Sequence, residues 1–371
     1  MKYGFFFVAL AILLSFCGYV IARGVQALPS SGIYRHIYLG LMIALFAIMI
    51  GSLIFGESLA PTLAKTLSFA GFSFLILVVY LFFSFLLVDI VRISNYFLHF
   101  APVGMAGFRL WTMAGSLVVI GVAMGVGNYK FNHPAIVTLD LSIDKPLQNK
   151  EIKIVAVSDL HLGISIDKKR LKSYVELINA QKPDIVLIAG DVSDHSSKPI
   201  IRQNMGEELR AIKAPLGVYA ISGNHEYFSA NPQATWEYLR KSGIIVLRDS
   251  VVLVTNSFYI VGRDDRTNRE RKDLTEIVKG LDNSKPRILL DHQPYYLEEA
   301  EQNGFDLQIS GHTHNGQIFP GNLIVKKMYE LGYGYLKKGK THYYVSSGLG
   351  LWGPEYRIGT QSELVVIKLK I

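Results

Sequence analysis

The segment IKIVAVSDLH, residues 152–161, decides the fold of the C-terminal part of the chain. Its first six residues, five of them apolar, have the length of one buried β-strand, and Asp159 and His161 follow directly. The same order returns in four later segments: 185–194, 218–226, 288–292 and 307–314. Further apolar runs lie at 136–141, 258–261, 343–345 and 364–369, and helical patterns at 168–179, 207–212, 234–241 and 274–281. This alternation predicts an α/β domain with mixed sheets.

The polar residues after the predicted strands are candidates for one shared site. Strand ends at one edge of a sheet lie close together, and ligands bind there. Alternate residues of an extended chain point the same way, so Asp159 and His161 can face one ligand. His312 and His314 form a second such pair. Glycines that permit tight turns precede three candidate positions: Gly190, Gly223 and Gly311. Asp, Asn and His ligands suit Mn²⁺, Fe or Zn²⁺ better than Mg²⁺ or Ca²⁺.

The first third of the chain has the composition of a membrane domain. Four long apolar runs lie at 3–21, 37–55, 67–91 and 110–126, and Asp89 is the only charged residue inside a run. Each run has about the 20 residues that a helix needs to cross a bilayer core. Lys2 before the first run would also suit a signal peptide, but we expect a retained anchor. We predict a transmembrane domain of four helices over residues 1–129 and a second domain over residues 130–371.

The charge of the chain points to the membrane rather than to nucleic acid. The net charge is +8, but residues 1–130 carry seven basic and two acidic residues and hold most of the excess. We therefore expect no nucleic-acid partner. Four crossings put both ends of the chain on one side of the membrane. The loops after the first and third runs carry Arg23, Arg35, Arg92 and Arg109, against Lys2, Lys65 and Lys130 on the other side. The positive-inside rule then favours an external C-terminal domain.

The series of motifs resembles the calcineurin-like metallophosphoesterase family. The matching residues, in order, are Asp159, His161, Gly190, Asp191, Asp194, Gly223, Asn224, His225, Glu226, His292, Gly311, His312, Thr313 and His314. A narrower likeness rests on GHTHNGQIFP at 311–320 and SGLGLWGPEYR at 347–357. It is to the membrane-associated branch, which includes UDP-2,3-diacylglucosamine pyrophosphatases and the animal transmembrane protein with metallophosphoesterase domain. Asn315 stands where that branch usually has glycine. The resemblance covers about residues 130–371 and implies a four-layer αββα sandwich of two mixed sheets.

The resemblance also implies a site with two divalent metal ions. One ion would be held by Asp159, His161, Asp191 and His314, and the other by Asp191, Asn224, His292 and His312. Asp191 would bridge the ions, which would activate a shared water for in-line attack on phosphorus. His225 would be the catalytic acid rather than a ligand. Arg357, and Asn224 in addition to its metal, would contact the substrate phosphate. Asp194 is expected outside the ligand set, and His195 has no expected role.

These observations favour a membrane-anchored phosphoesterase that cleaves a phosphodiester or pyrophosphate bond. The lysine- and tyrosine-rich segment 323–342 suits an anionic lipid surface, which favours a phospholipid-like or nucleotide-lipid substrate. The resemblance suggests UDP-2,3-diacylglucosamine and lipid A biosynthesis at the bacterial inner membrane. That substrate is made in the cytoplasm, so an external domain would favour an envelope glycolipid. The alternatives are a phosphodiesterase of soluble substrates, whose anchor only sets its location, and a non-catalytic binding or sensing module. Membrane lipids are expected partners, and no protein partner is predicted.

Overall fold

The computed structural model describes residues 2–30, 32–100, 105–147 and 151–370. The chain forms two compact units, Met1–Val126 and Gly127–Ile371. Helix α4 (Met105–Asn132) belongs to both, because its last turn is part of the C-terminal unit. Phe131 in that turn is fully buried in the core of the C-terminal unit. The C-terminal unit therefore begins three residues before the predicted boundary at residue 130.

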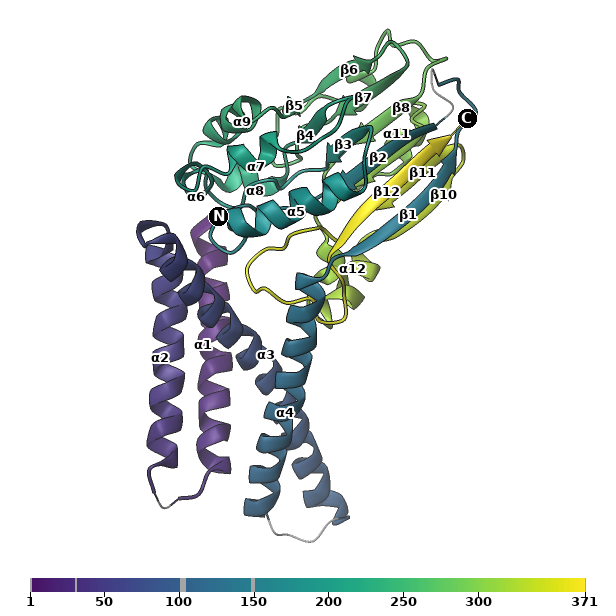
Figure 1. The fold of residues 1–371 in the computed structure, drawn as a ribbon. Coiled ribbons are helices and arrows are strands. Elements are labelled where there is room, and N and C mark those ends of the chain that lie inside the picture. Colours follow the sequence, from purple (N-terminus) through teal and green to yellow (C-terminus); the bar gives the residue numbers. More distant parts are fainter. Residues whose placement is uncertain (1, 31, 101–104, 148–150, 371) are drawn as a thin grey trace. The chain divides into compact units, whose positions relative to one another are not determined.

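Long apolar helices make up the described part of the N-terminal unit (Figure 1). They are α1 (Lys2–Ala27), α2 (Tyr34–Phe55), α3 (Pro61–Leu98) and α4, with a short turn η1 (Gly56–Ser58). All four are long and apolar enough to cross a membrane. Close packing of α2 on α3 depends on Gly71, because a Cβ atom there would lie 2.7 Å from the Cα atom of Met49. The prediction of four long apolar helices is confirmed.

Helix α3 is longer than the predicted run 67–91. It has 38 residues and extends for about 57 Å at 1.5 Å per residue. Pro61 suits the first turn of a helix, and His99 ends α3 in a left-handed conformation with φ of 50°. The hydropathy of the sequence marks only the apolar centre, whereas the helix continues through more polar residues at both ends. Its length exceeds a bilayer core of about 30 Å.

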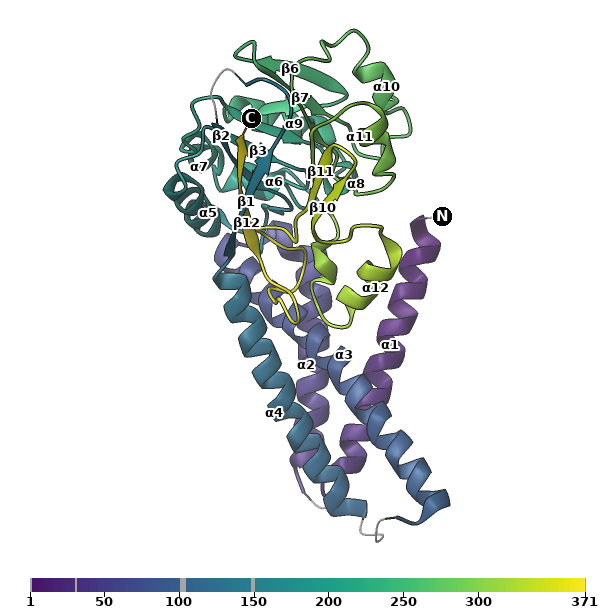
Figure 2. The same ribbon diagram turned by 90° about the vertical axis from the view of Figure 1, so that its right-hand side faces the viewer.

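Two six-stranded mixed sheets form the C-terminal unit (Figures 1 and 2). The first has the order β1 (Ala135–Ser142), β12 (Glu363–Lys370), β2 (Glu151–Val157), β3 (Ile185–Ile188), β4 (Val218–Ile221), β5 (Ile245–Leu247). The second has the order β10 (Gly334–Lys338), β11 (Thr341–Val345), β9 (Leu307–Ser310), β8 (Arg287–Leu290), β7 (Phe258–Gly262), β6 (Ser250–Val254). Strands β2 to β5 are parallel, as are β11, β9, β8 and β7. The polar ends of the parallel strands therefore gather at one edge of each sheet.

Three apolar cores separate four layers. One lies between the first sheet and helices α5 (Lys168–Ala180), α6 (Lys198–Arg202), α7 (Gly206–Arg210) and α9 (Pro232–Lys241). The second lies between the sheets, and the third between the second sheet and helices α10 (Leu274–Ile277) and α11 (Glu298–Gln302). Strand β2 shows the cause: Val155 and Val157 enter the first core, whereas Ile154 and Ala156 enter the second. The prediction of a sandwich of two mixed sheets is confirmed.

Several short elements were not predicted. Strands β5, β6 and β10 and helices α6, α8 (Asn224–Phe228), α11 and α12 (Gly321–Met328) are absent from the sequence prediction. The segment 323–342, expected to be a loop, contains most of α12 and the whole of β10. The helix expected at 274–281 is the single turn α10. Elements of three to eight residues are too short to show a clear hydrophobic period.

Candidate metal centre

The predicted site residues come from the ends of neighbouring strands. In the first sheet, Asp159, Asp191 and Asn224 follow β2, β3 and β4, which are adjacent and parallel. In the second sheet, His292 and His312 follow the adjacent parallel strands β8 and β9. The structure thus brings both sets of strand ends to one place, as the sequence predicted.

Left-handed backbone conformations mark these loops. Five site residues adopt them although they are not glycine: Asp159 (φ 54°), His161 (47°), Asp191 (52°), His312 (71°) and His314 (49°). Backbone hydrogen bonds hold the first loops, with the Asp159 N–H donating to the Gly190 carbonyl at 3.0 Å. The His161 N–H donates to the Asp191 carbonyl at 2.9 Å. Strain of about 1–3 kcal/mol per residue is typical of positions that fix functional side chains.

A first group of buried donors consists of Asp159, His161 and His314, with Asp191 beside them. The Nε2 atoms of His161 and His314 lie 3.1 Å apart. Asp159 Oδ1 lies 3.4 Å from His314 Nε2 and 3.9 Å from His161 Nε2. Asp191 Oδ2 lies 3.7 Å from His161 Nε2. Imidazole nitrogens that face one another between two carboxylates suit a bound divalent cation.

A second group consists of Asp191, Asn224, His292 and His312. His292 Nε2 lies 3.2 Å from Asp191 Oδ2 and 3.2 Å from Asn224 Oδ1. His312 Nδ1 lies 2.8 Å from the same amide oxygen. The other ring nitrogen of His292, Nδ1, donates to the Ala189 carbonyl at 2.7 Å, so Nε2 presents its lone pair to the group. A histidine that binds a metal requires this arrangement.

The two groups fit two divalent ions. Asp191 Oδ2 is common to both, because it faces His161 on one side and His292 on the other. Burial is the main cause that lowers the pKa of His312 to about 4. Burial is also the main cause that holds the pKa of His314 well below its usual value. Both imidazoles are therefore neutral at pH 7, which is the form that coordinates metals.

His225 lies beside the first group and bonds to a carboxylate outside it. Its Nδ1 atom is 3.0 Å from Asp194 Oδ1, and its ring is 4.5 Å from that of His161. Its backbone N–H donates to Asp191 Oδ1 at 2.9 Å. Burial alone would lower the pKa of His225, but the hydrogen bond to Asp194 and the nearby carboxylates outweigh it and raise that pKa. His225 is thus placed to hold a proton at the edge of the donor groups.

The sequence analysis gave no role to three neighbours of His225: His195, Phe228 and Trp352. Asp194 Oδ1 also contacts the Nδ1 atom of His195 at 2.8 Å, and the side chain of His195 is half exposed. Burial alone would raise the pKa of Asp194, but its histidine neighbours hold that pKa well below the usual value. Phe228 and Trp352 lie near the His225 ring, at 5.1 and 6.1 Å between centroids. The adjacency of Asp194 and His195 was the available signal, but nothing in the sequence placed Trp352 beside them.

Two glycines are required at the donor groups. At Gly190 a Cβ atom would lie 2.5 Å from His292 Nδ1, and the backbone conformation is a second reason. Gly190 has a φ angle of 88°, which residues with a side chain rarely adopt. Gly223 has an extended backbone instead, and a Cβ atom there would lie 2.1 Å from Asp191 Oδ1. The expectation that Gly223 permits a turn is therefore replaced by a steric reason: the backbone must pass close to the Asp191 carboxylate.

The structure corrects the prediction for Arg357. The side chain is completely buried, and its guanidinium donates to backbone carbonyls rather than facing a substrate. Its Nη1 atom donates to the His314 carbonyl at 2.9 Å, and Nη2 donates to the carbonyls of Gly348 at 3.1 Å and Gly350 at 2.6 Å. Arg357 thus holds the loop that carries His314. The sequence could not show this because a basic residue in a Gly-rich segment suits a phosphate equally well.

Asn315 stands where the resemblance led us to expect glycine, and its backbone conformation is one that both residues adopt. Its φ of 49° and ψ of 36° are left-handed, which glycine adopts freely and asparagine tolerates. The Thr313 hydroxyl accepts a hydrogen bond from the Asn315 N–H at 3.1 Å. The substitution therefore preserves the turn that follows His314.

The fold and its donor groups define a metal-dependent hydrolase. Comparison with protein families matches residues 152–316 to "Calcineurin-like phosphoesterase". An uncharacterized metallophosphoesterase of Campylobacter jejuni is 34% identical over 262 residues, which cover 69% of this chain and 69% of that protein. The transmembrane protein with metallophosphoesterase domain of Danio rerio is 30% identical over 284 residues, which cover 72% of this chain and 64% of that protein. The chain belongs to the calcineurin-like phosphoesterase family.

Solved structures add only a distant likeness. The NAD nucleotidase of Haemophilus influenzae matches with a TM-score of 0.36 at 15% identity, over 54% of this chain and 46% of that one. A dimetal phosphatase from Danio rerio matches with a TM-score of 0.34 at 12% identity, over 53% of this chain and 88% of that one. These values carry no argument about substrate.

Proposed function

We propose that this chain hydrolyses a phosphodiester or pyrophosphate bond with two divalent ions held by the two donor groups. The first ion is assigned to Asp159, His161, Asp191 and His314, and the second to Asp191, Asn224, His292 and His312. The observation that supports this most directly is the position of Asp191 Oδ2 between His161 and His292. One carboxylate oxygen that faces both groups suits a bridge between two ions.

Each residue of the site then has its own role in the proposed hydrolysis. When bound, the ions would lower the pKa of a shared water and neutralise charge on the phosphate. Asp194 accepts from His225 Nδ1 and thereby leaves Nε2 as the nitrogen that can act on the leaving oxygen. The raised pKa of His225 favours the protonated form that such an acid requires. Asn224 is assigned to the metal, and Arg357 to the support of the His314 loop.

Metal reconstitution tests this function. Full-length protein in detergent is stripped with a chelator and resupplied with Mn²⁺, Fe²⁺ or Zn²⁺, and hydrolysis of a chromogenic phosphodiester is measured. We expect metal-dependent turnover that falls at least 10³-fold in Asp191→Asn, together with loss of bound metal. Asp144→Asn is the matched control, because the Asp144 side chain is 85% exposed. Full turnover by metal-free protein, or unchanged turnover in Asp191→Asn, would contradict the assignment.

The surroundings of His225 favour a substrate with an apolar part. Phe228 and Trp352, both near His225, are 55% and 47% exposed. On α12 the side chains of Leu323, Ile324 and Met328 are also exposed. Helix α12 packs directly against the loop that follows His314, since a Cβ atom on Gly316 would lie 2.1 Å from the backbone of Gly321. Apolar side chains exposed this close to the donor groups are available to the acyl chains of a lipid.

We therefore assign the substrate to the phospholipid-like or lipid-linked phosphoesters. Nucleotide lipids such as UDP-2,3-diacylglucosamine, and hence lipid A biosynthesis, are members of this class. In the triple variant Leu323→Ser, Ile324→Ser, Met328→Ser, we expect KM for a lipid phosphodiester in mixed micelles to rise about tenfold. Turnover of a water-soluble chromogenic diester should not change. Leu253→Ser, on the exposed side of β6, is the control. Equal loss or no loss on both substrates would favour a phosphodiesterase of soluble substrates.

A further inference from the structure

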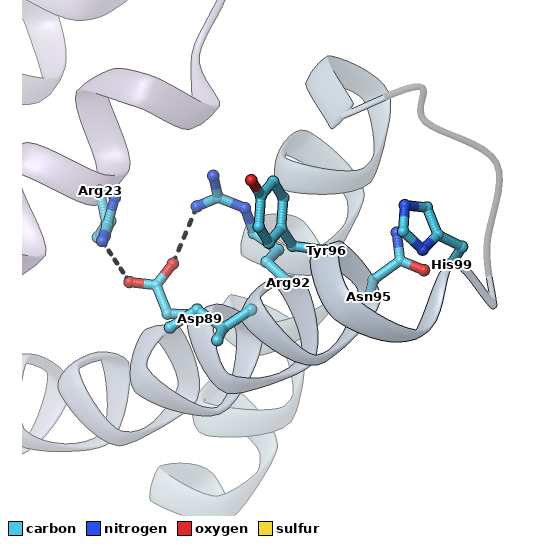
Figure 3. A pocket seen from close by; sticks show the side chains of 7 residues that line it. Arg23, Asp89, Arg92, Asn95, Tyr96 and His99 are labelled. Atoms are coloured by element: carbon cyan, nitrogen blue, oxygen red, sulfur yellow. Dashed lines mark hydrogen bonds and ion pairs between the residues drawn. The ribbon is translucent and has the colours of Figure 1, made fainter.

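The N-terminal unit contains a group of charged side chains unrelated to the donor groups. Arg23 lies near the end of α1, Asp89 and Arg92 lie near the end of α3, and Arg109 lies near the start of α4. Figure 3 shows Arg23 and Arg92 on either side of the Asp89 carboxylate, with Tyr96 beside Arg92. Arg23 and Arg92 therefore pair with Asp89, and Arg109 lines a small hollow together with all three residues.

Both carboxylate oxygens of Asp89 have partners. Its Oδ2 atom lies 2.5 Å from Arg23 Nη2 and accepts a hydrogen bond from the Tyr19 hydroxyl at 2.7 Å. Its Oδ1 atom accepts from Arg92 Nη1 at 2.9 Å. One carboxylate balances one guanidinium, so the three arginines leave two positive charges without an opposite charge from Asp89. Such charges between apolar helices are costly unless an anion accompanies them.

A cavity lies next to this cluster. Its volume is about 450 Å³, and its lining includes Arg23, Asp89, Arg92, Asn95, Tyr96 and His99. A smaller hollow on the side of α4 joins Arg109 to the same arginines. Among the described residues, the buried Nε atoms of Arg92 and Arg109 have no hydrogen-bond partner. The cavity is thus large enough for a small anionic group; Arg23 and Arg92 line it, and Arg109 lines the smaller hollow.

Arg35, a fourth arginine of this unit, shows how a guanidinium with a structural role is bonded here. Arg35, in the first turns of α2, donates from Nε and Nη2 to the Leu28 carbonyl at 3.3 and 3.0 Å. Arg35 therefore satisfies a backbone carbonyl directly after the C-terminal end of α1. The Nε atoms of Arg92 and Arg109, in contrast, donate to no acceptor among the described residues. This difference separates the two residues from an arginine with a purely structural role.

We propose that this cavity binds the phosphate group of an anionic phospholipid. A guanidinium offers a planar pair of donors that matches a phosphate. The cavity lies where long apolar helices end, so it meets the headgroup level of a bilayer. Ile93 and Phe97 are 60% and 70% exposed on α3 near the cavity and are available to the acyl chains. Basic pockets between membrane helices attract anionic lipids. This lipid would be a ligand of the membrane unit, distinct from the substrate of the phosphoesterase.

Lipid binding to the full-length protein tests the proposal. Delipidated protein in detergent is titrated with phosphatidylglycerol, with phosphatidylcholine and with inorganic phosphate, and bound lipid is counted by native mass spectrometry. We expect phosphatidylglycerol to bind at least tenfold more tightly than phosphatidylcholine. Arg92→Gln and Arg109→Gln should each weaken phosphatidylglycerol about fivefold, because each removes one basic group. Arg35→Gln should bind as the wild type does.

The binding measurements on the wild-type protein alone can overturn the proposal. Equal affinity for phosphatidylglycerol and phosphatidylcholine would exclude a site for anionic lipid. Displacement of phosphatidylglycerol by inorganic phosphate at similar concentration would show a site for a soluble anion instead. Melting temperatures without lipid report whether each variant folds. Arg109→Lys keeps the positive charge but loses the planar pair of donors, so its affinity for phosphatidylglycerol should be intermediate. This variant remains informative if a glutamine variant does not fold. Wild-type affinity for phosphatidylglycerol in both Arg109→Lys and Arg92→Gln would contradict the assigned contacts.

Discussion

One hydrogen bond decides which ring nitrogen of His225 is available to a substrate. Nδ1 faces Asp194 at 3.0 Å, so only Nε2 can serve a leaving oxygen. We predict that His225→Ala lowers kcat about 10²–10⁴-fold for a phosphodiester with an alkyl leaving group. For a nitrophenyl ester, whose leaving group needs no proton, the loss should be about tenfold or less. Rates on both esters, with metal content measured in parallel, check this.

The control for His225 is its outer neighbour. His195→Ala removes a half-exposed ring that touches Asp194 but lies farther from the donor groups. We expect a small effect of equal size on both esters. An equal loss on both esters in His225→Ala would assign that residue to phosphate binding rather than to proton donation.

The close passage of the backbone at Gly223 gives a second prediction. In Gly223→Ala the new Cβ atom would lie 2.1 Å from Asp191 Oδ1, so the carboxylate must move. Because Asp191 faces both donor groups, we expect metal affinity to fall about 10–100-fold, as for other changes that disturb a ligand. Metal titration of stripped protein measures this. Gly115→Ala, where nothing lies within 4 Å of the new Cβ, should bind metal normally.

Residue types and spacing predicted most of the candidate site but not its contacts. The Asp, Asn and His residues after the strands were identifiable because catalytic chemistry restricts residue type and because strand ends meet. The sequence could not show the direction of a side chain. Arg357 was expected to face a phosphate, yet it points to the carbonyl of His314. Asp194 was expected to support the site from outside the ligand set or to fix a loop, and the structure adds that its partner is His225.

At the scale of elements, the last turn of α4 belongs to the phosphoesterase unit. Phe131 is fully buried there, and the Arg170 guanidinium lies 4.7 Å from its ring centroid. The Asn128 side chain donates to the Glu355 carbonyl at 2.9 Å. A fragment of residues 127–371 should therefore melt higher than a fragment of residues 135–371. The loss of Phe131 alone should cost about 3–5 kcal/mol, or about 10 °C in a domain of this size.

Calorimetry of the two fragments measures this difference, and Phe131→Ala in the longer fragment separates the ring from the rest of the turn. Tyr129→Ala is the control, because that side chain is 63% exposed. Equal melting temperatures for both fragments would mean that the turn contributes nothing to the C-terminal unit.

Long or repeated patterns were predictable at this scale, and short elements were not. The apolar runs of the four long helices and the strands that carry the donors were apparent, since each presents many apolar residues in order. Strand β10 has only five residues, GYLKK, and contains no run of apolar residues. β10 is a strand because it forms backbone hydrogen bonds with β11. This pairing cannot be predicted from the residues of β10 alone.

At the scale of the whole molecule, the side of the membrane on which the phosphoesterase lies determines which lipids it can meet. The positive-inside rule favours the inside for the loops after α1 and α3, and the proposed lipid site is built from arginines beside these same loops, so a cytoplasmic leaflet would suit both. With this orientation we expect an external C-terminal unit, whose substrate would be an envelope glycolipid or phosphodiester rather than a nucleotide lipid made inside the cell.

Cysteine labelling in intact cells tests this topology directly. Cys17 is the single cysteine, so Cys17→Ser gives a background without thiols. Asp144→Cys then reports on the C-terminal unit, and Ile33→Cys, at a 65% exposed position, reports on the loop after α1. We predict that a membrane-impermeant maleimide labels Asp144→Cys in intact cells and Ile33→Cys only after permeabilisation. The reverse pattern would place the phosphoesterase inside, where UDP-2,3-diacylglucosamine is made, and would make that nucleotide lipid the first substrate to test.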